Sequence, residues 1–413
     1  MKKVISFALV LALIFSLAAC GKKKNSDIEV VKDYESQPAS GDSEGGQKVA
    51  VNNIDNAFDF KNGCSWVRYS NGTMYLVNTK GNILYASEHH HGGGDMCDDA
   101  CFVKEEISEG NYVYKIINKN GNVVASSADG KFDEILAAGD NLFFVHKYDG
   151  GIDRSRNLYG TINEKGEFVN QLRECPFRDA KFSVAKYIGS NSFLFGDEVS
   201  YYNACIYMST CDKFFAYGHR EYAVEGVGSD LYIYDNRGIM AEGSEKEYSK
   251  SDEGYEYVVV RSDGKIEKAP KFSYIANGLL VTNDEENKSV SFTDPATGKT
   301  FNFSKYYISS AEAADDKLLV HINGADQKNY CTILDKTGNM LFEPVMGTGA
   351  KASDGRLVLR TDEGYSVLDY TGKVIVPAGT YSYIGSFNSG IAWAKNSSDQ
   401  YVGIDVNGKV VIS

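Results

Sequence analysis

Hydrophobic and polar positions alternate with a period of two over short stretches of this chain, most clearly in its C-terminal segment GIAWAKNSSDQYVGIDVNGKVVI. In GIAWAK, Ile391 and Trp393 fall on one face and the two alanines on the other. A period of two over so few residues predicts β-strands and not a helix. The turn Asp405–Gly408 then predicts a hairpin, because Asp caps backbone N–H groups and Gly adopts a positive φ without a steric penalty.

The same turn recurs along the chain, and most of its glycines are spaced about 40 residues apart, with one interval of 72 in which a marker is missing. A fixed period of this size is typical of repeat proteins, and hairpins without intervening helices favour a propeller. We therefore predict an all-β fold, a single β-propeller of 7–9 blades over residues 48–413. The one helical expectation is a short turn at Ser310–Asp316. The predicted turns are Asn78–Gly81, Asn118–Gly121, Asn163–Gly166, Asp235–Gly238, Arg261–Gly264, Asp294–Gly298, Asp335–Gly338, Asp369–Gly372 and Asp405–Gly408.

The C-terminal unit resembles a WG repeat, in which a Gly-Leu-Ala-like strand precedes a Trp-Gly-Tyr-Ile-Asp hairpin and a Gly-Lys-Val-Ile return. Tyr401-Val402-Gly403 replaces Lys-Trp-Gly, so the Trp that names the repeat is absent. The likeness is good over the last 35 residues or so and loose back to about residue 60. It implies a repetitive β fold with a binding or scaffold role, and it implies no shared catalytic residues.

The N-terminus predicts export and lipidation. Residues 1–19 combine a basic head with an apolar run that is too short for a membrane span, as in a secretory signal peptide. The run ends in Leu-Ala-Ala-Cys20, which resembles the bacterial lipobox, so Cys20 is the predicted lipidation site. Three lysines follow and suit anionic headgroups. Residues 20–47 are polar and predict a flexible tether, which places a lipid-anchored protein on the extracytoplasmic side of the cell membrane.

The chain is acidic. Lys and Arg number 43 against 56 acids, and removing Lys2 and Lys3 with the signal leaves 41 against 56, a net charge of −15. Such a body repels nucleic acid, and the sequence has no basic stripe with interleaved aromatic residues, so we expect no nucleic-acid partner. Excess acid keeps a surface protein soluble. Attraction to a cationic partner or to divalent cations stays open.

Seven cysteines besides Cys20 permit disulfides in an exported protein, and their odd number leaves at least one unpaired. Cys97 with Cys101, and Cys205 with Cys211, are close enough in sequence to staple local loops, although connectivity cannot be deduced. Cys331 lies in a strand-like run and is expected to be a buried apolar residue. The remaining cysteines are Cys64 and Cys175.

Residues 88–101 hold three of the six histidines, two cysteines and several acids. Cysteine and imidazole are the ligands that Zn²⁺ prefers, and imidazole also suits Cu or Ni. However, no second cysteine pair follows at the spacing of a structural zinc site. The simpler interpretation is a flexible Gly-rich hairpin loop with Cys97 and Cys101 oxidised to each other, so we assign no metal or other cofactor.

Catalytic motifs are absent: the sequence has no nucleophile elbow, no His-Glu-x-x-His, no phosphate loop and no dinucleotide fingerprint. His146 and His321 lie in strand-like runs, and His219-Arg220-Glu221 in a polar one. The many tyrosines and phenylalanines are expected mostly in the core, with some as surface platforms for sugars or peptides. We predict a monomeric binding or scaffold module, with an envelope protein or glycan as partner. A glycan-active enzyme and an envelope assembly factor remain alternatives.

Overall fold

The computed structural model describes residues 46–149, 157–177, 184–196, 204–217, 224–236, 239–244, 247–248 and 256–413. All of them belong to one compact unit, residues 38–413. The signal peptide, Cys20 and nearly all of the tether lie outside the described residues, as do His219, Arg220 and Glu221.

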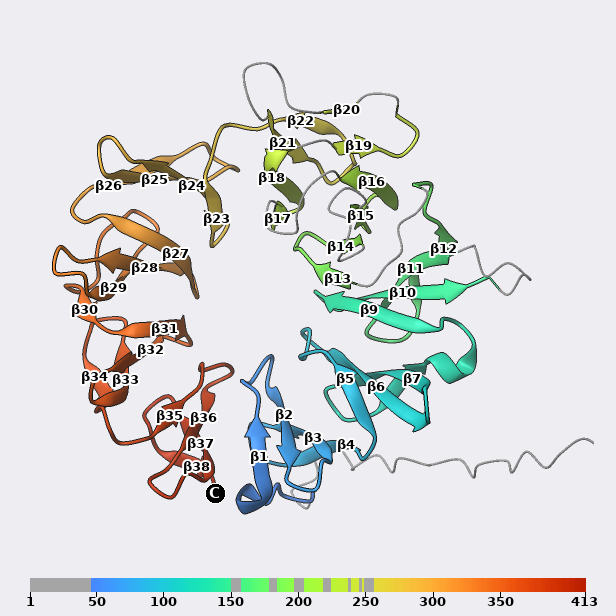
Figure 1. The fold of residues 1–413 in the computed structure, drawn as a ribbon, viewed down its shortest axis with the longest axis horizontal. Helices are drawn as coiled ribbons and strands as arrows, with labels where there is room; N and C mark the ends of the chain where they lie inside the picture. Colours follow the sequence, from blue (N-terminus) through green and yellow to red (C-terminus); the bar gives the residue numbers. More distant parts are fainter. Residues whose placement is uncertain are drawn as a thin grey trace, which may run out of the picture. The chain divides into compact units, whose positions relative to one another are not determined.

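Nine small antiparallel sheets follow one another around a ring (Figure 1). The predicted β-propeller is thus confirmed, with nine blades. Each blade begins with its innermost strand and ends at the rim. The described residues contain no α-helix, and their two 3-10 turns are η1 (Val51–Asn53) and η2 (Ser127–Asp129).

The strands of the first five blades are as follows. Blade 1 comprises β1 (Ile54–Ala57), β2 (Cys64–Tyr69), β3 (Met74–Asn78) and β4 (Ile83–Ser87). Blade 2 comprises β5 (His90–Gly93), β6 (Ala100–Ser108), β7 (Asn111–Asn118) and β8 (Val123–Ser126). Blade 3 comprises β9 (Glu134–Gly139), β10 (Leu142–Tyr148), β11 (Asn157–Asn163) and β12 (Phe168–Glu174). Blade 4 comprises β13 (Val184–Tyr187), β14 (Ser192–Gly196), β15 (Ala204–Met208), β16 (Lys213–Tyr217), β19 (Ile239–Ala241) and β20 (Glu247–Tyr248). Blade 5 comprises β17 (Val224–Val227), β18 (Asp230–Asn236), β21 (Glu256–Val260) and β22 (Ile266–Lys268).

Four regular blades complete the ring. Blade 6 comprises β23 (Tyr274–Ala276), β24 (Leu279–Asp284), β25 (Ser289–Thr293) and β26 (Thr300–Phe303). Blade 7 comprises β27 (Ile308–Ala314), β28 (Lys317–Asn323), β29 (Asn329–Leu334) and β30 (Val345–Met346). Blade 8 comprises β31 (Thr348–Ser353), β32 (Arg356–Thr361), β33 (Gly364–Asp369) and β34 (Val374–Val376). Blade 9 comprises β35 (Tyr383–Ile384), β36 (Ile391–Lys395), β37 (Tyr401–Asp405) and β38 (Val410–Ile412).

The predicted alternation is present in β36, and both of its faces are buried. Ile391 and Trp393 pack toward blade 1, in a cluster with Val67. Ala392 and Ala394 pack toward blade 8, in a cluster with Val358. The small residues on one face and the large ones on the other fit because each blade is covered by a neighbour on either side.

The recurring turn joins the third strand of a blade to its fourth and also seals the joint with the preceding blade. In the turn of blade 2, the Asn118 side-chain oxygen accepts hydrogen bonds from two backbone N–H groups, each at 3.0 Å. Gly121 has a φ of +83°, and a Cβ built on it would lie 2.0 Å from the carbonyl oxygen of Leu84 in β4 of blade 1. The same glycine in blade 3, Gly166, lies against Val124 of blade 2. Gly is therefore required both by the backbone conformation and by close packing.

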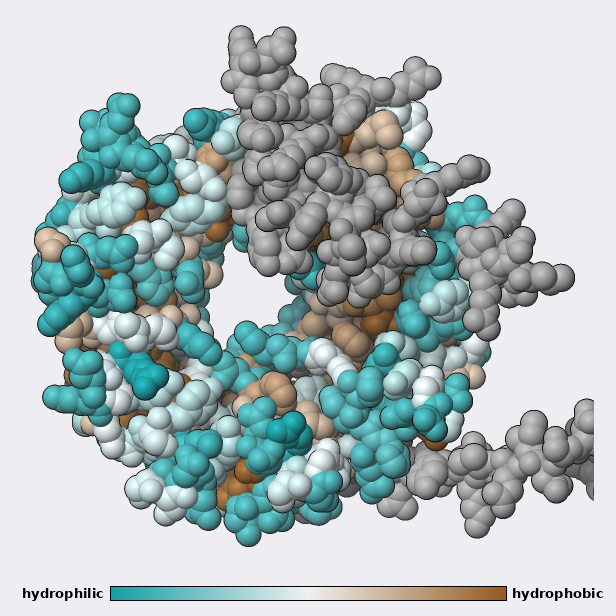
Figure 2. Space-filling view, viewed as in Figure 1, coloured by the Kyte–Doolittle hydropathy of each residue, from teal (hydrophilic) through white to brown (hydrophobic). Residues whose placement is uncertain are grey.

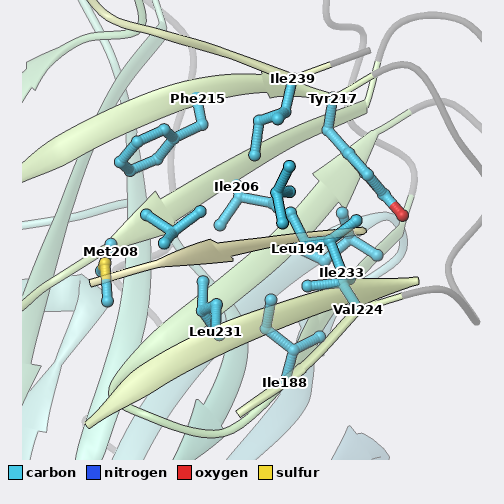
Figure 3. Close-up of a cluster of buried hydrophobic side chains, with 12 residues drawn as sticks. Ile188, Leu194, Ile206, Met208, Phe215, Tyr217, Val224, Leu231, Ile233 and Ile239 are labelled. Carbon is cyan, nitrogen blue, oxygen red and sulfur yellow. The ribbon is translucent and has the colours of Figure 1, made fainter. Parts of the chain in front are cut away.

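Blades 4 and 5 depart from the predicted turn pattern. Asp235–Gly238 was predicted as a hairpin turn, and this is wrong, because β18 and β19 belong to different sheets. β19 instead pairs with β16 of blade 4. A segment that lies between two strands of blade 5 in the sequence therefore adds β19 and β20 to the sheet of blade 4. Figure 3 shows Ile239 beside Phe215 and Tyr217 in the core that both blades share. The interval of 72 residues between turn glycines contains the β15–β16 turn of blade 4. In that turn Asp212 adopts a φ of +49° at a position where the other turns have glycine.

The predicted helical turn at Ser310–Asp316 is also wrong. Most of it belongs to β27, the inner strand of blade 7, which pairs with β28 along its length. Ala and Glu favour helix in isolation, but pairing with a buried strand outweighs such a weak preference. The small side chains suit the innermost position, where neighbouring blades converge.

The ring closes between blade 1, which is formed by the N-terminal strands β1–β4, and blade 9, which is formed by the C-terminal strands β35–β38. In the described part of the chain, no strand from one end completes the sheet at the other end. Trp393 of blade 9 is fully buried and stacks on Phe60 at 5.3 Å between ring centroids. Its Nε1 donates a hydrogen bond of 2.8 Å to Ser65 Oγ of blade 1. Lys351 of blade 8 adds an ion pair of 3.0 Å to Asp59. Closure thus rests on side-chain contacts.

The face of the propeller seen in Figure 2 is mostly hydrophilic, and the ring has an open centre. The inner strands of the blades border this opening (Figure 1). Hydrophobic side chains are largely confined to the joints between blades.

Candidate functional site

The long hairpin β6–β7 of blade 2 carries aromatic and basic side chains on the face toward blade 3. Lys104 pairs with Tyr114 across the two strands. Its Nζ lies 4.1 Å from the centre of the Tyr112 ring and 5.4 Å from that of Tyr114. These distances are those of cation–π contacts, so the lysine holds both rings in place. His91 of β5 extends the row, with its ring centroid 4.6 Å from that of Tyr112.

Blade 3 contributes a second group of side chains from β9 and β10. His146 is buried, and its Nδ1 lies 3.4 Å from Glu134 Oε2 while its Nε2 lies 2.9 Å from Asn157 Oδ1. The ring of Tyr148 meets that of His146 edge-on at 4.4 Å. Tyr148 is 45% exposed, so it presents a large aromatic surface to solvent. The predicted strand position of His146 is confirmed.

The two groups interact electrostatically across the joint. Burial raises the pKa of Tyr114 to about 12, and the nearby Glu134 carboxylate and the hydroxyls of Tyr148 and Tyr112 add to the rise. The hydrogen bond from His146 lowers the pKa of Glu134, with a further contribution from the charge of Lys104. Charged groups on blade 3 therefore shift a pKa on blade 2, and Lys104 of blade 2 shifts the pKa of Glu134 on blade 3. We call this set the blade 2–3 cluster: His91, Lys104, Tyr112, Tyr114, Glu134, His146 and Tyr148.

The chemistry of the blade 2–3 cluster suits binding. Flat aromatic faces with one cation and one carboxylate among them can stack on a ligand and fix its orientation by hydrogen bonds. Both charged groups already have partners within the cluster, and no nucleophile with an adjacent base is part of it.

The opposite face of the same hairpin carries a buried ion pair between its two strands, and blade 1 forms a hydrogen bond to it. Lys115 Nζ lies 2.7 Å from Glu105 Oε2, and both side chains are less than a fifth exposed. Tyr85 of β4 donates a hydrogen bond of 2.9 Å to Glu105 Oε1. Glu105 and Lys115 each follow directly on a cluster residue, so the ion pair fixes the strands that carry the cluster.

Replacing Glu105 by Gln is expected to destabilise the protein by roughly 3–5 kcal/mol at neutral pH, because Lys115 would be left buried and unpaired. Burial raises the pKa of Glu105, but the hydrogen bonds from Lys115 and Tyr85 and the charge of Lys115 outweigh this, so the pKa lies below its ordinary value. The stabilisation is therefore present above about pH 4.3, the ordinary pKa of Glu, and is lost as the pH falls through the lowered one. Urea unfolding of wild type and Glu105→Gln between pH 3 and 7 measures both effects. A variant with an unchanged acid dependence would contradict the assignment.

The segment predicted as a flexible loop and alternative metal site, residues 88–101, is partly a strand. β5 places His90 against Trp66, with ring centroids 5.5 Å apart, and His91 against Tyr112. Burial raises the pKa of the Cys97 thiol to about 11 and that of Cys101 well above its ordinary value. Protonated thiols are poor metal ligands. Among the residues that the structure describes, no three His, Cys, Asp or Glu side chains gather in a way that could hold a metal ion.

The seven cysteines after Cys20 are free thiols in this structure, and Cys331 is buried in β29 as predicted. Cys205 lies in β15, whereas Cys211 lies in the turn beyond the far end of that strand and donates to the Met208 carbonyl. A strand rises about 3.3 Å per residue, so the predicted local staple between Cys205 and Cys211 is not formed. Cys205 instead lies next to Cys175 of blade 3.

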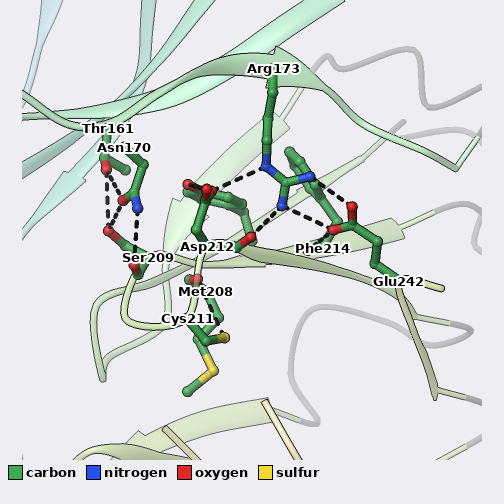
Figure 4. A network of polar contacts seen from close by, with 10 residues as sticks. Thr161, Asn170, Arg173, Met208, Ser209, Cys211, Asp212, Phe214 and Glu242 are labelled. Atoms are coloured by element: carbon green, nitrogen blue, oxygen red, sulfur yellow. Dashed lines mark hydrogen bonds and ion pairs between the residues drawn. The ribbon is translucent and has the colours of Figure 1, made fainter. Parts of the chain in front are cut away.

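Arg173 of β12 clamps blade 3 to the widened sheet of blade 4 (Figure 4). Its guanidinium binds both carboxylate oxygens of Glu242, at 2.8 and 2.9 Å, and Asp212 Oδ1 at 3.1 Å. The guanidinium also lies 4.5 Å from the centre of the Phe214 ring. Glu242 directly follows β19, so the contact with Arg173 stabilises the position of β19 beside β16 in the sheet of blade 4. This network is structural.

The sequence did not identify the blade 2–3 cluster. Its residues lie on five strands of two blades, and only strand register and blade packing bring them together. The one local signal is the alternation of tyrosines in Tyr112–Lys115, beside a turn with Glu109 and Gly110. That alternation predicts one shared face but does not show whether the face is core or surface.

Comparison with known proteins agrees with the repeat architecture. Residues 365–398 match the family model described as WG containing repeat. The chain thus carries a WG repeat within a β-propeller. No curated protein sequence matches the chain.

A search of solved structures gave several partial similarities. A eukaryotic initiation factor shares 10% identity, with 80% of this chain and 89% of that chain covered, at a TM-score of 0.40. An uncharacterized protein from Listeria monocytogenes EGD-e shares 12% identity, with 89% and 96% covered, at a TM-score of 0.38. The dihydro-heme d1 dehydrogenase NirN shares 8% sequence identity, with 88% of this chain and 73% of that chain covered, at a TM-score of 0.38.

The part of the chain that the structure describes has no helix long and apolar enough to cross a membrane.

Proposed function

We propose that this protein is a lipid-anchored extracytoplasmic binding module that holds a glycan of the cell envelope at the blade 2–3 cluster. The observation that carries the proposal is the convergence of Tyr112, Tyr114 and Tyr148 from two blades around one lysine and one carboxylate. The binding role of a WG-repeat propeller agrees with it. The anchor is proposed from the sequence alone, through Cys20.

A saccharide is the ligand class that this chemistry favours. The C–H faces of a pyranose ring stack on tyrosine, and its hydroxyls accept from Lys104 and donate to Glu134. A protein interface needs a contiguous apolar centre. The strongly exposed apolar side chains are instead spread over several blades, as with Val123, Val169 and Val374.

The test is a calorimetric titration of the full mature chain with saccharide fragments released from bacterial cell-wall glycan. Replacing Tyr112 by Ala removes a stacking face and the partner of Lys104, so affinity is expected to fall about tenfold or more, the equivalent of about 1.4 kcal/mol. Tyr307→Ala is the matched control, because Tyr307 is 42% exposed and lies between blades 6 and 7. Equal affinity of the two variants would refute the site, and absence of saccharide binding to the wild type would refute the ligand class.

A further inference from the structure

Two cysteines that are far apart in sequence meet at the joint between blades 3 and 4. Cys175 directly follows β12, and Cys205 is the second residue of β15, 30 residues later. Their Sγ atoms lie 3.9 Å apart, within hydrogen-bond distance for thiols. Cys205 is buried and Cys175 is half-buried, so Cys175 is the more accessible of the two residues.

The other cysteines of the described residues lie in different surroundings. Cys64 and Cys101 are buried in the same core cluster between blades 1 and 2, and Cys331 is buried in β29. Cys97 and Cys211 each donate to a backbone carbonyl of a residue two or three positions earlier. Among the described residues, Cys175 and Cys205 are the cysteines whose sulfurs lie within hydrogen-bond distance of each other.

The surroundings assign different roles to the two thiols. The hydrogen bond between the two thiols lowers the pKa of Cys175, although burial opposes this, and the charges of Glu242 and Arg173 act in opposite directions. The same contact, together with burial, raises the pKa of Cys205. A thiolate forms more readily on Cys175, which is also the less buried residue of the two.

We propose that Cys175 and Cys205 are a redox-active pair that forms a disulfide between blades 3 and 4 on exposure to a small-molecule disulfide. The Cys175 thiolate attacks one sulfur of the external disulfide, whose S–S bond breaks and releases one thiolate. Cys205 then gives up its proton and attacks Cys175 Sγ, and the second external thiolate leaves. The two cysteines lose two electrons and two protons, and the external disulfide gains them as two thiols.

The geometry favours closure of this bond. A disulfide needs a sulfur separation of about 2 Å, so the two sulfurs, now 3.9 Å apart, must approach by about 2 Å through side-chain rotation. The Arg173 clamp already holds the end of β12 against blade 4. The bond would close a loop that spans both blades and thereby restrain the unfolded chain, so oxidation raises the unfolding temperature. The pair is separate from the blade 2–3 cluster, and its test does not depend on ligand binding.

The experiment treats the reduced, folded full chain with oxidised glutathione and maps its peptides by mass spectrometry without reduction. Wild type and the control Cys211→Ser are expected to yield a peptide that links Cys175 to Cys205, with two fewer free thiols and a higher unfolding temperature. Cys205→Ser is expected to keep glutathione on Cys175, because the second step is blocked. A link from Cys205 to Cys211 would overturn the proposal, as would folded wild type in which both thiols stay free.

Discussion

Replacing Gly121 by Ala is expected to destabilise the propeller by about 2–5 kcal/mol. A non-glycine residue in the left-handed region costs about 1–2 kcal/mol, and forcing an atom into a packed joint typically costs about 1–3 kcal/mol more. Both costs apply here, since φ is +83° and the new Cβ would lie 2.0 Å from the Leu84 carbonyl oxygen. Backbone and not a flexible side chain is the obstacle, so blades 1 and 2 would have to move apart.

The matched control is Gly110→Ala in the β6–β7 turn of the same blade. Gly110 has a φ of +75°, yet a Cβ there would meet no atom within 4 Å. Only the conformational cost applies, about 1–2 kcal/mol. Urea unfolding of the two variants separates the two contributions. Equal losses would show that the turn glycine does not seal the joint between blades.

Replacing Trp393 by Ala is expected to cost about 3–5 kcal/mol, the usual range for removing a buried aromatic side chain. Its indole is fully buried, stacks on Phe60 and donates to Ser65. Because blades 1 and 9 share no strand, this side chain is a principal contact that closes the ring. We therefore expect the loss of amide-exchange protection to fall mainly on blades 1 and 9.

Two variants serve as controls for the ring-closure prediction. Trp393→Phe keeps an aromatic ring on Phe60 and loses the hydrogen bond, so a smaller loss is expected. Trp66→Ala removes a tryptophan that is 6% exposed from the joint of blades 1 and 2, which the chain itself connects. Hydrogen exchange should then report loss of protection at blades 1 and 2 only. Protection lost evenly around the ring in Trp393→Ala would contradict the role of Trp393 in closure.

The sequence predicted strands and turns well where local chemistry determines them. The period of two in GIAWAK holds in β36, and eight of the nine predicted turns, all except Asp235–Gly238, join paired strands as expected. The prediction failed where partners are distant. Asp235–Gly238 has the same local pattern, but β19 pairs with β16 of another blade. In blade 4, Asp212 replaces the expected glycine, so the marker could not be recognised.

The candidate site shows the same limit more strongly. His146 and the tyrosines of Tyr112–Lys115 were each recognisable as strand residues, yet their meeting depends on which face of blade 2 turns toward blade 3. The contact between Cys175 and Cys205 likewise crosses two blades. Short sequence distance favoured Cys205 with Cys211, whereas the strand between them holds that pair apart.

The most direct test of the binding role is a pull-down from native cell envelopes with the full mature chain tethered through its N-terminus. Wild type and Tyr112→Ala are compared side by side, and bound glycans and proteins are both identified. We expect wild type to enrich glycan and Tyr112→Ala to lose most of it. A single protein partner, retained equally by both chains and without glycan, would contradict the account and point to a scaffold role elsewhere on the propeller.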